Sequence, residues 1–250
     1  MNRQALSIVF LLLAVLAPFF AQAIEFSADA YQQSPQAHPQ QSRMYVGANG
    51  VRKEYVKNGV SIVEIYGLGQ EKTLVLYPAS RTYLEKKKAT ASFTHAVSTE
   101  SSNLCSGMQN ANCKKLNSEV VNGRNAVKWQ VETKDDGKSE VAEYWIDQSR
   151  FMILRERLPD TTLVEMRFIG HEMMQNRKVE KWERLTTLPG KERFSALQWY
   201  DDQLGLFVRE ELPGGYLRAL LNIRPGTQPG ALFAIPAGYK MIEKEMEKSN

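Results

Sequence analysis

The chain has 250 residues, of which 43% are hydrophobic and 24% charged, and its formal net charge is +4. Basic and acidic residues are interspersed along the whole chain, a balance that argues against a nucleic-acid-binding protein. The densest basic run, 86–88, follows Glu85 directly and is interpreted as a solvated strand end rather than a docking patch for anionic lipid.

The first 23 residues have the features of a secretory signal peptide. Arg3 precedes an apolar stretch from Leu6 to Phe20, and residues 21–23 form an A-x-A cleavage site. The apolar stretch is shorter than the roughly 20 residues of a membrane-spanning helix, and no second long apolar segment follows. We therefore expect cleavage after Ala23 and a periplasmic mature protein, 24–250, that is not an integral membrane protein.

Residues 24–88 have the pattern of an antiparallel meander, in which runs of β-branched and aromatic residues are separated by turn signals. Asn58-Gly59 is the clearest signal, because these two residues accept the positive φ angles of a tight hairpin turn. The Gln- and Pro-rich segment 32–42 is predicted to be a loop. The predicted strands are 25–31, 44–46, 51–56, 60–66, 73–77 and 82–86.

Residues 89–117 are predicted to be an ordered excursion from the sheet, with or without a short helix, because Ser, Thr and Asn are frequent there and apolar residues are sparse. Cys105 and Cys113 are the only cysteines, and an exported chain meets an oxidising compartment, so we expect them to form a disulfide. Closure of so short a loop would contribute roughly 2–3 kcal/mol. No histidine or further cysteine accompanies the pair at metal-ligand spacing, and we expect no metal and no cofactor.

Segment 118–169 is repeated at 171–223. Trp129 aligns with Trp182, and after one inserted residue Trp145 aligns with Trp199. The other aligned identities are Glu119 with Glu172, Arg124 with Arg177, Lys128 with Lys181, Asp147 with Asp201, Arg155-Glu156 with Arg209-Glu210, and Leu158-Pro159 with Leu212-Pro213. Each copy amounts to a few strands and cannot bury its own apolar face, so the copies are predicted to lie side by side in one sheet.

Apolar and polar residues alternate along the repeated strands, as at Val127, Trp129 and Val131, which indicates one apolar and one wet face. Helices to cover the apolar face are scarce, since only the tail after Tyr239, within 224–250, looks helical. The chain is therefore predicted to be mainly β, with one large curved antiparallel sheet that encloses its apolar face. The candidates for the lining of this enclosed space are bulky apolar residues, and the alternative is that they simply form the core. They are Trp129, Met152, Met166, Phe168, Trp182, Trp199 and Phe207.

The sequence contains none of the common catalytic or metal-binding motifs. His38, His95 and His171 are scattered, and none has metal-ligand spacing to another histidine or a cysteine. The acidic pairs 135–136 and 201–202 are interpreted as solvent-facing turn formers, and the repeated Arg-Glu pairs as cross-strand ion pairs. The chain is accordingly predicted not to be an enzyme.

The closing stretch LFAIPAGYK, 232–240, resembles the C-terminal signature of a family of exported bacterial proteins that is similar to the LolA and LolB lipoprotein-carrier superfamily. Segments 26–29, 77–83 and 119–123 agree with this resemblance. It implies an unclosed half-barrel around an apolar cavity, with short helical or loop lid segments and with the excursion around the cysteines as a plug. In that family the cavity takes up lipid acyl chains. The chain lacks the family's N-terminal helix before the first strand, and the tandem copy is an addition.

The leading hypothesis is a non-enzymatic periplasmic carrier of a lipid, an acylated lipoprotein or a similar amphiphile. The alternative is a sensing or scaffold module of the cell envelope that binds a protein partner. A hydrolase that acts on envelope material through His95 or His171 is the third hypothesis.

Overall fold

The computed structural model describes residues 24–67, 72–87, 110–135, 137–150, 152–191 and 193–243. The first strands are β1 (Phe26–Ser34), β2 (Ala37–Gly47), β3 (Gly50–Lys57), β4 (Val60–Gly67), β5 (Lys72–Tyr77), β6 (Thr82–Lys87), β7 (Ala111–Val121) and β8 (Arg124–Asp135). The remaining elements are β9 (Lys138–Asp147), β10 (Ile153–Arg157), β11 (Leu163–Met174), β12 (Arg177–Thr187), β13 (Arg193–Asp201), β14 (Leu206–Leu212), β15 (Tyr216–Pro225), the 3₁₀ turn η1 (Gly230–Phe233) and β16 (Lys240–Met241).

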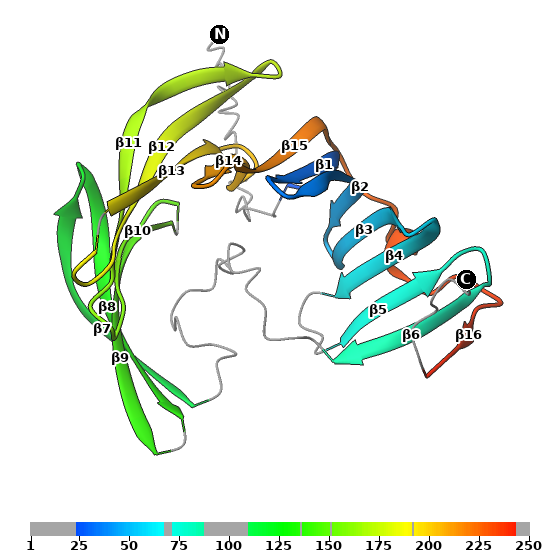
Figure 1. Ribbon diagram of the computed structural model, residues 1–250, viewed down its shortest axis with the longest axis horizontal. Helices are drawn as coiled ribbons and strands as arrows, with labels where there is room; N and C mark the ends of the chain where they lie inside the picture. Colours follow the sequence, from blue (N-terminus) through cyan, green and yellow to red (C-terminus); the bar gives the residue numbers. More distant parts are fainter. Residues whose placement is uncertain are drawn as a thin grey trace, which may run out of the picture.

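All sixteen strands belong to one sheet. Its order is β16-β6-β5-β4-β3-β2-β1-β15-β14-β13-β12-β11-β10-β9-β8-β7. Two meanders, β1–β6 and β7–β15, are joined by the antiparallel pairing of β1 with β15. The sheet bends into an arc with β7–β9 in one arm and β4–β6 in the other (Figure 1), and its ends do not pair. The prediction of a mainly β protein with one large, unclosed, curved sheet is confirmed.

Tight turns connect the first strands as predicted. Asn58 and Gly59 have φ angles of 52° and 76°, and they join β3 to β4. Segment 32–42, predicted to be a loop, instead forms the hairpin of β1 and β2. The loop prediction was wrong because proline is tolerated at a strand edge. Pro39 lies in a part of β2 that pairs only with β1, since the pairing of β2 with β3 begins at Arg43.

The C-terminal segment packs on β3–β6. Phe233 and Tyr239 cover a cluster of Val63, Ile65 and Leu76. The helix predicted after Tyr239 is wrong over the described residues, because Lys240 and Met241 pair in parallel with β6. The exposed backbone of β6 offers hydrogen bonds that a short isolated helix cannot match. Residues 244–250 lie outside the described residues.

The two faces of the sheet follow from the strand register. The C-terminal segment, orange to red in Figure 1, lies outside the arc beside β4–β6. We call the face that it covers, with Val63 and Leu76, the outer face. We call its opposite the inner face, which lies on the concave side of the arc (Figure 1). Paired residues share a face, so Ala28, Met44 and Val75 lie on the inner face.

The tandem copies lie next to each other in the sheet, as predicted. The first copy, 118–169, runs from the end of β7 into β11, and the second, 171–223, runs from the end of β11 into β15, so that aligned segments form equivalent strands. One buried cluster lies between them. It contains Val121, Ala126, Trp145 and Met166 of the first copy and Trp182 and Tyr200 of the second.

A second cluster repeats this arrangement one unit further along the sheet. Met174, Val179 and Trp199, which align with Val121, Ala126 and Trp145, pack against Phe26 and Ala28 of β1. Met44 and Leu220 complete the apolar surface that receives them. The repeat is therefore a unit of packing, and β1 and its neighbours take the place of a third copy.

The strand β7 begins at Ala111, inside the predicted excursion 89–117. Cys113 lies on β7 and pairs in register with Val131, whereas Cys105 lies outside the described residues. The disulfide and the domain boundaries stay predictions, as does the signal peptide at 1–23. Within the ranges that the structure covers, no helix is long and apolar enough to cross a membrane.

The clusters predict different roles for the two aligned tryptophans. Replacement of the fully buried Trp182 by Ala should lower the free energy of unfolding by about 3–5 kcal/mol, because it leaves a cavity between the copies. Trp129→Ala should cost clearly less, since Trp129 is partly exposed. Urea denaturation followed by circular dichroism measures both, and equal losses would contradict the packing role assigned to Trp182.

Candidate functional site

The inner face is apolar in both arms. In the arm of β7–β9, Val127, Val131, Ala142 and Ile146 are buried on this face. In the other arm, the side chains on the same face include those of Val51, Ile62, Val75, Tyr77 and Leu84. Apolar side chains thus line both walls of the arc, a surface that suits the hydrocarbon part of a ligand.

A polar belt separates the two apolar walls on the inner face, where β10–β15 lie. Glu156 forms an ion pair with Arg184 at 3.2 Å. Gln198 donates a hydrogen bond of 2.7 Å to Glu210, which also lies 4.0 Å from Arg218. The middle of the inner face can therefore make hydrogen bonds.

A second polar group lies on the inner face of β3 and β4. Tyr55 donates a hydrogen bond of 2.9 Å to Glu64, and Tyr66 donates to the other oxygen of the same carboxylate. Burial, followed by the hydrogen bond to Glu64, raises the pKa of both tyrosines well above its ordinary value. Lys53 lies 5.1 Å from the ring centre of Tyr55. This group holds one carboxylate among aromatic side chains.

A tryptophan on the outer face of the first copy is held by charged neighbours. The indole N–H of Trp145 donates to Glu119. Lys128 and Arg155 lie 4.6 and 5.5 Å from the ring centre. Each such cation–π contact contributes about 0.5–1 kcal/mol.

The second copy repeats this group with the aligned residues. Trp199 donates a hydrogen bond of 2.7 Å to Glu172, and Lys181 and Arg209 lie 5.0 and 5.4 Å from its ring centre. The hydrogen bond from Lys181, and then that from Trp199, lowers the pKa of Glu172. Four of the aligned identities are therefore explained by one side-chain arrangement that fixes the strands.

Charged side chains gather at the seam between the copies. Glu180, which is buried, accepts hydrogen bonds of 3.1 Å from Arg124 and 3.0 Å from Arg150. Arg150 also forms an ion pair of 3.0 Å with Asp202. His171 lies 3.9 Å from Glu180. These residues come from both copies, so the seam brings together groups that are far apart in sequence.

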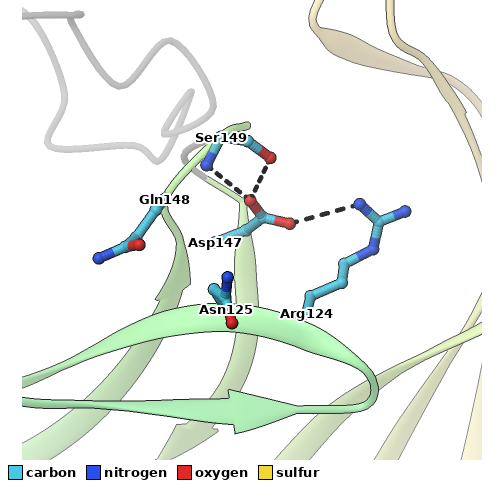
Figure 2. Close-up of a pocket in the computed structure, with 5 residues that line it drawn as sticks. All are labelled: Arg124, Asn125, Asp147, Gln148 and Ser149. Carbon is cyan, nitrogen blue, oxygen red and sulfur yellow. Dashed lines mark hydrogen bonds and ion pairs between the residues drawn. The ribbon is translucent and has the colours of Figure 1, made fainter.

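A polar pocket of about 370 Å³ opens beside this seam (Figure 2). It is lined by Arg124, Asn125, Asp147, Gln148 and Ser149, which come from the start of β8, the end of β9 and the turn after it. Asp147 is 2% exposed. The pocket thus presents one buried carboxylate and one guanidinium group to a small polar ligand.

The predicted lining residues are not gathered on one wall. Met152, Met166 and Trp182 lie in the buried cluster between the copies, and Phe207 packs against it. Three others are placed differently: Trp199 lies on the outer face in the second cluster, Trp129 is partly exposed on the inner face, and Phe168 is 40% exposed. Their role as a ligand lining stays a prediction.

The polar predictions have mixed outcomes. Asp201, predicted to face solvent, is 1% exposed and forms an ion pair with Arg177, so that interpretation was wrong. The repeat carried the missing signal, because Asp147 and Arg124 occupy the aligned positions. Arg155 makes a cross-strand ion pair of 2.8 Å with Glu165, as predicted.

Arg209 instead pairs with Glu211 on its own strand, at 2.5 Å. Among the scattered histidines, His38 and His171 are exposed, and His95 lies outside the described residues. No group of three or more metal-ligating side chains occurs in the part of the chain that the structure describes.

No family model and no curated protein matches the chain. Solved structures do match. A domain from Vibrio parahaemolyticus named for outer membrane lipoprotein sorting is 12% identical, with 85% of this chain and 90% of that chain covered and a TM-score of 0.39. A LolA superfamily protein from Nitrosomonas europaea is 12% identical over the same shares, with a TM-score of 0.36. The Pseudomonas aeruginosa MucA/MucB complex matches at 10% identity, with 82% and 94% covered and a TM-score of 0.21. Two of these three similar structures are thus named for lipoprotein sorting or for the LolA superfamily.

The group around Trp199 predicts an acid-dependent loss of stability. The pKa of Glu172 is lowered from its ordinary value of 4.5, so its stabilising effect is present above that value and is lost as the pH falls through the lowered pKa. Glu172→Gln should therefore flatten the fall in melting temperature below about pH 4.5. Thermal unfolding between pH 3 and 7 measures this, with Glu140→Gln on an exposed strand position as the control for loss of charge. A variant curve parallel to that of the wild type would contradict the assignment.

Proposed function

We propose that the protein is a non-enzymatic periplasmic binding or carrier protein that holds the acyl chain of a lipid, an acylated lipoprotein or a similar amphiphile in the hollow of the arc. The observation that carries the proposal is the apolar inner face of both arms, in a sheet that stays open between its ends. An acyl chain requires such a surface, since about 0.8 kcal/mol is gained for each CH₂ group that is buried.

The arrangement of polar groups supports an amphiphile rather than a purely apolar ligand. The belt around Arg184, Gln198 and Glu210 lies between the two apolar walls. A head group could make hydrogen bonds there while its chain contacts a wall. The signal-peptide pattern of residues 1–23 supports a periplasmic location.

A second candidate function is that of an envelope module that binds a protein partner. The observation that favours it is a group of exposed apolar side chains on β11: Phe168, Ile169 and Met173 are 40%, 53% and 70% exposed. Exposed apolar groups of this kind are common at interaction surfaces. The two functions differ in what they predict to co-purify with the protein.

The direct test is to express the full-length chain so that the protein is exported, to purify it without detergent and to analyse an organic extract by mass spectrometry. A carrier should yield one defined lipid or acylated species in near-stoichiometric amount. A well-folded protein with an empty extract and one stoichiometric protein partner would favour the second function and overturn the first.

A substitution on the inner face sharpens this test. Ala30 is partly exposed on the inner face of β1, where it pairs with Leu220. Ala30→Trp should lower the co-purified amphiphile at least tenfold, because the indole occupies the hollow. Ser195→Trp places the same side chain on the exposed outer face of β13 and should leave the amount unchanged. Equal amounts in both variants would argue against the inner face as the binding surface.

A further inference from the structure

The polar pocket beside the seam holds a carboxylate with one oxygen that lacks a hydrogen bond. Asp147 Oδ1 accepts hydrogen bonds from the backbone N–H and the hydroxyl of Ser149, at 2.7 and 2.6 Å, and from the backbone N–H of Arg150 at 3.2 Å. Asp147 Oδ2 is buried and accepts none. A buried carboxylate oxygen without a donor is costly, so a donor that enters the pocket would stabilise it.

The aligned carboxylate of the second copy has no such deficit. Asp201 Oδ1 accepts hydrogen bonds of 3.1 Å from Arg177 and 3.0 Å from the backbone N–H of Leu204. Its Oδ2 accepts a hydrogen bond from Nε of Arg177. The fold therefore allows the aligned arginine to satisfy this carboxylate, and the first copy departs from that arrangement.

Arg124 is shared between Asp147 and a carboxylate of the second copy. Its NH2 group donates to both carboxylate oxygens of Glu180, at 3.1 and 3.3 Å, and its guanidinium carbon lies 4.9 Å from the ring centre of Trp182. Its NH1 group lies 3.5 Å from Asp147 Oδ2, which is too long for a good hydrogen bond (Figure 2). The NH1 group of Arg124 can therefore donate to a further partner in the pocket, and Asp147 Oδ2 can accept from one.

The charges around the pocket favour a cation beside Asp147. Two guanidinium groups, from Arg124 and Arg150, face three carboxylates, from Asp147, Glu180 and Asp202. A ligand ammonium group would supply the missing donor to Asp147.

We propose that this pocket binds a small zwitterion in which a primary ammonium group stands a few atoms from a phosphate. The ammonium group donates to Asp147 Oδ2, and the phosphate accepts from NH1 of Arg124. Asn125, Gln148 and Ser149 line the remaining wall with further polar groups. This chemistry occurs in a free phosphoamine and in the head group of an aminophospholipid. The proposal does not depend on the acyl-chain site.

Calorimetric titration of the full exported protein with O-phosphorylethanolamine tests the proposal, with ethanolamine and inorganic phosphate as half-ligands. The zwitterion should bind at least tenfold more tightly than either half. Gln148→Trp, which fills the pocket from an exposed position, should weaken binding at least tenfold. Asp147→Asn should weaken it similarly, with Asp201→Asn in the second copy as the matched control. Melting temperatures of all variants show which of them are folded.

Two results would overturn the proposal. One is the absence of binding of O-phosphorylethanolamine at millimolar concentration to the wild-type protein, which would leave water as the donor to Asp147. The other is unchanged binding in a folded Gln148→Trp variant. If binding is found, vesicles with and without phosphatidylethanolamine separate its sources. Binding only to the soluble compound indicates a free phosphoamine, and preferential binding to the lipid-containing vesicles indicates a head group.

Discussion

The pairing of β1 with β15 is the interaction on which the rest of the structure depends. Apart from the short β16, every other pairing in the sheet joins strands that follow one another in the chain, whereas this one joins residues 26–33 to residues 217–225. Such a long-range contact has a large entropic cost, and both edges of the junction are reinforced. Asn222 donates a hydrogen bond of 2.8 Å to Asp29, and Gly226 donates one of 2.8 Å to the backbone of Glu25. Without this junction the two arms would be separate meanders.

The tandem repeat is the part of the fold that the sequence predicted best. Its register placed Trp145 over Trp199 and Asp147 over Asp201, and in the structure these residues occupy equivalent places on β9 and β13. The repeat predicted the arrangement of the strands because each copy cannot bury its own apolar face and must be covered by a neighbour. It could not show that β1 covers the second copy, because Phe26 and Ala28 share no sequence pattern with the repeat.

Other elements could not be predicted because local sequence was a poor guide to them. The glutamines and prolines of 32–42 favour a loop, yet β1 supplies a partner strand for half of that segment. Met241 and the charged residues after it favour a helix, yet the free edge of β6 captures Lys240 and Met241. The burial of two candidate lining residues could not be predicted for a related reason. Alternation along a strand assigns faces, but bulges at 153–155 and 168–170 decide which face meets the next copy, so Met166 and Trp182 became core.

The difference between the two copies arises from what covers each of them. The surface that packs on the second copy is apolar, with Phe26 and Ala28, and among the described residues Arg177 forms its ion pair with Asp201. The surface that packs on the first copy carries Glu180, which is buried beside Trp182 and must itself be paired with a cation. Arg124 satisfies Glu180 and in doing so leaves Asp147 short of one donor. The first copy packs against the second, whereas the second packs against β1 and its neighbours. The two copies therefore cannot keep the same side-chain arrangement. The seam is therefore where a polar binding function can arise without loss of the shared fold.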